Sequence, residues 1–208
     1  MMSIELWLAF VLASTALLVV PGPTVMVVAS YAIGRGKSSG WATVPGVALG
    51  DITAMTASLV GAGAILATSS TLFTILKLAG AAYLIWLGIG LWRSQGHLGS
   101  LPGVRDKSPM RMFWNAYIVT AFNPKGIVFF IAFVPQFVDP AGSVFAQFAL
   151  LEATFVVLAT INIIAWVLLA GSFSERFKRQ GSLRLANRIG GGFLIGAGLL
   201  TATVRRVG

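Results

Sequence analysis

The stretch LLVVPGPTVMVVASYAIGRGK, residues 17–37, places two prolines and a glycine inside an apolar run long enough to cross a membrane. A proline lacks the backbone N–H and clashes with the carbonyl one turn earlier, so Pro21 and Pro23 leave backbone polar groups without helical partners. Lipid cannot satisfy such groups. The break around Gly22 is therefore tolerable only where protein, water or a ligand meets it.

The composition predicts an all-α integral membrane protein. Of 208 residues, 57% are hydrophobic and 10% are charged, and the mean hydropathy is +0.87, which is far from the balance of a soluble domain. Helices are expected because their hydrogen bonds close within the segment. One transmembrane domain over residues 1–208 is the simplest organisation. One histidine and no cysteine leave few ligands for a transition metal, so we expect no metal and no other cofactor.

Basic residues set the expected orientation in the membrane. Apolar runs predict six spans, at residues 5–33, 40–67, 70–92, 112–138, 143–171 and 187–204. The links after the first, third and fifth spans hold eleven of the fifteen lysines and arginines. The positive-inside rule places these links in the cytoplasm and both termini outside. The net charge of +9 is thus explained by a multi-pass protein of the cytoplasmic membrane, without a nucleic-acid partner.

The two halves of the sequence resemble each other. Pro124 follows Pro23 by 101 residues, and Glu152 follows Asp51 by the same offset. The segment GAAYLIWLG (80–88) also matches GGFLIGAG (191–198) at an offset of 110, which pairs Tyr83 with Phe193 and Gly88 with Gly198. We therefore predict repeats at residues 5–93 and 111–206. Three spans in each make the second repeat inverted across the membrane, although apolar segments can also align by chance.

A second break is expected inside the fourth predicted span. Asn123 is a good N-cap and Pro124 a good first helical residue, so a half-helix should begin there. A helix start carries partial positive charge and free N–H groups, which can receive a carboxylate. Matched broken helices in inverted repeats are typical of secondary transporters. The alternative is a pair of kinks that serve packing alone.

Four motifs together resemble the lysine exporter family (LysE/RhtB) of amino-acid exporters. They are PGPT (21–24), GVALGD ending at Asp51, KLAGAAYLIWLG from Lys77, and FNPKGIVFF from Phe122. The resemblance covers nearly the whole chain. It implies a small cytoplasmic-membrane protein, not an enzyme, that exports amino acids or close derivatives using the proton gradient. The characteristic positions of the family map onto Pro21, Gly22, Pro23, Asp51, Asn123, Pro124 and Lys125.

Charges inside the predicted spans indicate a mechanism. Asp51 lies about eleven residues into its span, roughly 16 Å of helical rise, near the middle of a bilayer. A carboxylate there must be paired, protonated or hydrated. Lys125 lies in the first turn of its half-helix, where the dipole disfavours a cation, so we expect an acidic partner, either Asp51 or Glu152. These two acids are the candidate proton-coupling groups; a static buried ion pair is the alternative.

The sequence therefore predicts a proton-coupled exporter in which two repeats rock around a central site. The amino-acid carboxylate would meet a half-helix start or Lys125, and its ammonium an acid such as Asp51. A permease for another small solute or ion, a membrane-embedded enzyme and a scaffold remain alternatives, as does a homodimer formed through the small-residue pattern Gly46–Gly50. The candidate substrate-binding residues are Pro21, Gly22, Pro23, Thr24, Asn123, Pro124 and Lys125.

Overall fold

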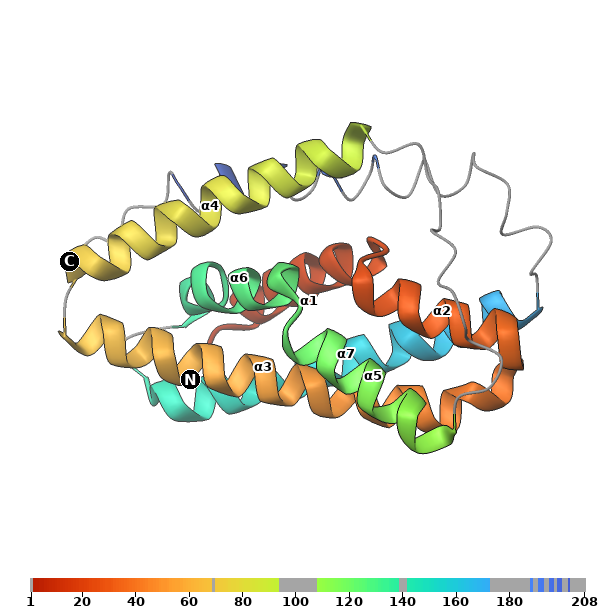
Figure 1. Cartoon of the computed structure of the whole chain (residues 1–208). Coiled ribbons are helices and arrows are strands. Elements are labelled where there is room, and N and C mark those ends of the chain that lie inside the picture. The colour runs from red at the N-terminus through yellow and green to blue at the C-terminus, as the bar shows by residue number, and fades with distance from the viewer. Residues whose placement is uncertain are drawn as a thin grey trace.

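The computed structural model describes residues 2–68, 70–93, 108–138 and 142–172, and eight helical positions between 188 and 202. Its helices lie side by side in a bundle (Figure 1). They are α1 (Ile4–Val19), α2 (Pro23–Arg35), α3 (Gly40–Thr68), α4 (Ser70–Arg93), α5 (Pro109–Ala121), α6 (Pro124–Ala132) and α7 (Val144–Ser172), with short 3₁₀ helices at Lys37–Ser39 and Val134–Phe137.

Two pairs of helices are bent at short breaks, and we call each pair a broken span. The axes of α1 and α2 differ by 54° across residues 20–22, and those of α5 and α6 differ by 42° across residues 122–123. The half-helices α2 and α6 each begin with a proline, Pro23 and Pro124, at a position where no backbone N–H is needed. Asn123 caps α6, as its sequence predicts. Both predicted breaks are therefore confirmed.

The breaks divide the apolar interior into two clusters. One joins α1 and α6 to α3 and α7 through residues such as Phe10, Phe130 and Phe155. The other joins α2 and α5 to the same two long helices, with Val28 and Ile163 at its centre. The first broken span thus runs from the first cluster to the second, and the other broken span runs back. The two broken spans are antiparallel, and their breaks lie between the two clusters.

Small residues let α3 and α5 approach closely. A Cβ atom added to Gly46 would lie 2.5 Å from the carbonyl oxygen of Phe113, and one added to Gly50 would lie 2.7 Å from Cβ of Thr120. Any larger residue would push the two helices apart. The Gly46–Gly50 pattern therefore packs helices within the chain, as small-residue patterns do between membrane helices.

The described positions near the C-terminus pack against α4 in a reciprocal manner. A Cβ on Gly88 would lie 2.6 Å from the Gly191 carbonyl oxygen and 2.8 Å from the Ile195 side chain. A Cβ on Gly198 would lie 2.7 Å from the Ile85 side chain. The 110-residue offset matches Gly88 with Gly198 and Ile85 with Ile195. Each glycine therefore contacts the isoleucine that lies three residues before its matched glycine. The rest of the predicted sixth span, including Phe193, lies outside the described residues.

The outer surface is suited to lipid. The segments Lys37–Gly61 and Val144–Ala170 are long and apolar enough to cross a membrane, with mean hydropathies of 1.3 and 2.3, and each broken pair qualifies as one further span. Large apolar side chains such as Leu12, Trp41 and Phe145 are exposed. The described part of the chain is therefore all-helical, with an outer surface that fits a membrane. The basic links at 94–107 and 173–187 lie outside the described residues.

Candidate functional site

The carboxyl end of α1 is closed by a lysine from the other broken span. Pro21 cannot donate the helical hydrogen bond to the Leu17 carbonyl, because it has no N–H. The Lys125 ammonium donates to this carbonyl at 3.0 Å and to the Val20 carbonyl at 2.9 Å. A helix carboxyl end carries partial negative charge, which favours a cation. Lys125 of α6 thus supplies donors that the first break removes.

Asn162 of α7 supplies a donor for the Leu18 carbonyl, which lies between Leu17 and Val20 in the chain. Its side-chain amide donates to the Leu18 carbonyl at 3.1 Å. The end of α1 therefore depends on side chains from two helices that are more than 100 positions away in sequence. Such interhelical hydrogen bonds are a common use of asparagine within membranes.

The start of α6 is closed by its own cap, and the start of α2 is not. The Asn123 side-chain oxygen accepts from the Lys125 backbone N–H at 3.1 Å, and its amide donates to the Thr24 hydroxyl at 3.2 Å. Thr120, at the end of α5, also donates to the Thr24 hydroxyl, at 3.2 Å. Gly22, which precedes α2, has no side chain to cap the first turn. The positive end of the α2 dipole therefore has no side-chain cap.

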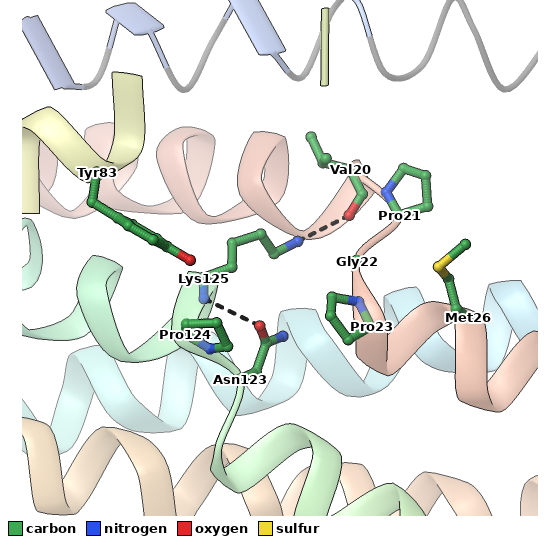
Figure 2. A pocket seen from close by; sticks show the side chains of 9 residues that line it. All are labelled: Val20, Pro21, Gly22, Pro23, Met26, Tyr83, Asn123, Pro124 and Lys125. Carbon is green, nitrogen blue, oxygen red and sulfur yellow. Dashed lines mark hydrogen bonds between the residues drawn. The ribbon is translucent and has the colours of Figure 1, made fainter. Parts of the chain in front are cut away.

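The two breaks meet around a cavity of about 190 Å³. It collects six of the seven candidate substrate-binding residues, and Figure 2 shows the Lys125 side chain extending across it toward Val20. Most of its wall is apolar. The lining residues are Val20, Pro21, Gly22, Pro23, Met26, Tyr83, Asn123, Pro124 and Lys125.

A smaller cavity of about 40 Å³ adjoins the first and holds the seventh substrate-binding candidate and one of the two candidate proton-coupling acids. Thr24 and Asp51 line it, and so does Asn162. Gly22, Asn123 and Lys125 line both cavities, and together they form what we call the shared wall. One side of this wall is largely apolar, and the other carries the buried carboxylate.

Asp51 is buried and has no direct partner within the described part of the chain. Only 9% of its surface is exposed, yet its carboxylate accepts no hydrogen bond from a described residue. Lys125 is close enough for the two charges to interact. The expected salt bridge is nevertheless absent among the described residues, because the Lys125 ammonium is hydrogen-bonded to main-chain carbonyls. Asp51 is thus the acidic neighbour of Lys125, but the direct hydrogen-bond acceptors of this lysine are main-chain carbonyls, which the sequence did not predict.

Glu152, the counterpart of Asp51 in the second half, lies elsewhere. It is half-buried on α7, where its carboxylate accepts a hydrogen bond of 2.6 Å from the Thr56 hydroxyl of α3. It lines neither the larger cavity nor the smaller one. The two acids occupy matched places in sequence but different environments.

Three residues of the larger cavity were not among the sequence candidates. They are Val20, directly after α1, Met26, one turn into α2, and Tyr83, in the middle of α4. The repeat alignment pairs Tyr83 with Phe193, so only the first half carries a hydroxyl at this position. This difference between the two halves was the sequence signal that could have indicated a role for Tyr83. It could not show which face of α4 meets the cavity, because α4 is apolar on all sides.

Comparisons with known proteins identify the family of the chain and several similar membrane proteins. The model of the LysE type translocator family matches residues 15–204. A homoserine/homoserine lactone efflux protein of Salmonella typhi is 33% identical, with 98% of this chain and 99% of that protein covered. A leucine efflux protein of Enterobacter sp. (strain 638) is 29% identical, covering 81% and 80%. An uncharacterized membrane protein of Vibrio cholerae is 30% identical, covering 98% and 100%. No solved structure matches the chain.

Proposed function

Because the chain belongs to the LysE type translocator family and is a multi-pass membrane transporter, we propose that it exports small amino acids or close derivatives in exchange for protons. Curated relatives are named as efflux proteins for homoserine, homoserine lactone and leucine. These are compact amino acids or derivatives with short side chains. A cavity of about 190 Å³ is of a size suited to such molecules.

The observation that carries the proposal is the shared wall between the two cavities. Substrate-sized space lies on one side of Gly22, Asn123 and Lys125, and on the other lies a buried carboxylate that accepts no hydrogen bond from the described residues. A buried carboxylate within a membrane must acquire a proton or another cation. A structural scaffold has no need of this arrangement, whereas an exchanger requires it.

The substrate carboxylate would bind at the Lys125 side of the larger cavity. An ammonium has three donors, and two of those of Lys125 are given to α1 carbonyls, which leaves one for a ligand. The uncapped start of α2 adds partial positive charge at Gly22. The apolar residues of the cavity then surround the substrate side chain.

The substrate ammonium would reach past Gly22 to Asp51. A Cβ atom on Gly22 would lie 3.3 Å from the Lys125 ammonium nitrogen, so a glycine keeps the shared wall thin. The smaller cavity has room for an ammonium group but not for a whole amino acid. Proton and substrate ammonium then neutralise the same carboxylate. Binding of one excludes the other, which is the requirement for exchange.

Alternating access would come from two inverted repeats. The reciprocal contacts of Gly88 and Gly198 and the antiparallel broken spans support such a relation. In secondary transporters, one repeat rocks against the other around a site of this kind. The expected orientation can be tested with single cysteines, since the chain has none of its own. A cysteine at Ser38 should resist an impermeant thiol reagent in intact cells, and one at Ser70 should react; the reverse would overturn the orientation.

The proposed function is tested by uptake into inside-out membrane vesicles with an acidic lumen. Radiolabelled L-homoserine, L-leucine and a panel of other amino acids would be compared in vesicles with and without the protein. We expect accumulation of at least one small neutral amino acid, and its loss when a protonophore collapses the gradient. Uptake of none of them, with folded protein present, would contradict amino-acid export. Uptake that the protonophore leaves unchanged would contradict proton exchange.

A further inference from the structure

The three tyrosines of the chain differ in what their hydroxyls contact. The Tyr31 hydroxyl accepts a hydrogen bond of 2.7 Å from the Asn115 side chain. The Tyr117 hydroxyl lies 3.4 Å from that of Thr53, in hydrogen-bond contact. The Tyr83 hydroxyl has no hydrogen-bond partner within the described ranges, and its ring contacts only that of Trp86, at 5.6 Å between centroids. Tyr83 is therefore the tyrosine whose polar group is left for a ligand.

Tyr83 also lies at an unusual depth for a tyrosine in a membrane protein. It follows the first residue of α4, Ser70, by 13 positions, about 20 Å of helical rise, and the helix continues to Arg93. Tyrosines that anchor a helix lie near its ends, at the level of the lipid head groups. A hydroxyl near the centre of the apolar segment Leu78–Gly90 needs a partner other than lipid.

The packing of α4 directs this hydroxyl into the larger cavity. Gly80 lies one turn before Tyr83 on the same face of α4, and a Cβ atom added there would overlap Cβ of Ala132 in α6. This close contact holds α4 against α6. Figure 2 shows the Tyr83 ring entering the cavity with its hydroxyl turned toward Lys125 and Pro124. The apolar lining opposite consists of Val20, Pro21, Pro23 and Met26.

We propose that Tyr83 is a specificity-determining residue, whose hydroxyl hydrogen-bonds an oxygen on the substrate side chain. The inference rests on the proposed function and names its substrate class as short amino acids that carry a hydroxyl or a similar polar oxygen. Lys125 and Asn123 are the other polar groups of the larger cavity, and they lie at the half-helix junctions that would hold the head group. Tyr83, from α4, is placed to contact the side chain. A site that hydrogen-bonds a substrate hydroxyl discriminates against the analogue that lacks it.

The test compares L-homoserine with L-norvaline, which has a methyl group in place of the hydroxyl. Their affinities for purified protein would be measured by calorimetry for the wild type and for Tyr83→Phe. The substitution removes one oxygen and keeps the ring. Tyr117→Phe is the matched control, because it removes an equivalent oxygen on α5 outside both cavities. We expect wild type and the control to prefer homoserine, and Tyr83→Phe to lower that preference about tenfold while norvaline binding is retained.

The outcomes separate this inference from the proposed function. If Tyr83→Phe binds both amino acids with the wild-type ratio, Tyr83 does not set specificity, and export of amino acids is unaffected. If wild type prefers norvaline, the substrate class is wrong although the cavity still binds amino acids. Binding of neither by the wild type would overturn the inference together with the head-group site on which it rests.

Discussion

The break between α1 and α2 and the break between α5 and α6 leave the same kind of backbone groups without helical partners, but they are closed in different ways. At the end of α5 the chain closes on itself: the Phe122 N–H donates to the Ile118 carbonyl and the Asn123 N–H to the Thr120 carbonyl, both at 3.0 Å. The next helix is then capped by the Asn123 side chain. The second break is therefore closed by its own residues.

At the first break, the free carbonyls accept hydrogen bonds from side chains of other helices. Val20, after the end of α1, has an extended backbone, and the last carbonyls of the helix accept from Lys125 and Asn162. The sequence explains the difference, because Pro21 removes the donor to the Leu17 carbonyl, whereas Pro23 and Pro124 occupy helix-start positions where no donor is needed. The first break thus depends on a charged side chain that also faces both cavities. Local structure and the proposed substrate site share one ammonium group.

The largest effect is expected for Lys125→Met. The change keeps much of the side-chain volume but leaves the Leu17 and Val20 carbonyls without their donor, which costs about 1–3 kcal/mol for each buried group. It also removes the cation proposed to bind the substrate carboxylate. Uptake into inside-out vesicles should fall about 100-fold, and the purified protein should melt at a lower temperature. Lys37→Met, which removes an exposed lysine outside both cavities, is the control. Wild-type uptake by Lys125→Met would exclude the carboxylate role.

A comparison of the two matched acids should give the next largest effect. Asp51→Asn removes the titrating group but preserves its size, so uptake driven by a pH gradient should fall at least about tenfold. Exchange of labelled for unlabelled substrate, which moves no net proton, should be less affected. Glu152→Gln should retain most of the gradient-driven uptake, because Glu152 lines neither cavity. The opposite ranking would make Glu152 the proton-coupling group.

The smallest effect concerns the amide side chains at the two breaks. Asn162→Leu should leave the Leu18 carbonyl without its donor and lower the free energy of unfolding by about 1–3 kcal/mol. Asn123→Ala removes a helix cap, which typically costs about 1 kcal/mol. Thermal melts of the two purified variants would measure the difference. Equal stability of Asn162→Leu and wild type would mean that the first break does not need the donor from α7.

The breaks themselves could be predicted from sequence because they have local causes. Proline, glycine and asparagine act on the residues next to them, so the end of α1 and the cap of α6 follow from PGP and from NP. The place of Asp51 near the middle of α3 also follows from counting residues along a helix. Thr24 and Asp51 were predicted as site residues, and they lie together on the smaller cavity.

The partner of Lys125 could not be predicted in the same way. Its acceptors are main-chain oxygens of Leu17 and Val20, more than 100 positions away, and every residue carries such an oxygen. Only the packing of α6 beside the end of α1 selects them. The orientation of Tyr83 could not be predicted for a related reason. The helix α4 has no polar face, and the side that contacts α6 is set by the approach of Gly80 to Ala132.

One ammonium, that of Lys125, closes the first break and is proposed to serve transport, and a second-site substitution separates these two roles. Pro21→Ala restores an N–H four residues after Leu17, so in the Lys125→Met background it can replace the missing donor. Thermal melts would compare wild type, Lys125→Met, Pro21→Ala and the double variant. Lys125→Met with Pro124→Ala would be the control, because the Thr120 carbonyl already has a donor. We expect Pro21→Ala, but not Pro124→Ala, to recover much of the melting temperature lost in Lys125→Met, with uptake still about 100-fold below that of the wild type. If the decreases in melting temperature of Lys125→Met and Pro21→Ala simply add in the double variant, the claim that Lys125 closes this break is contradicted.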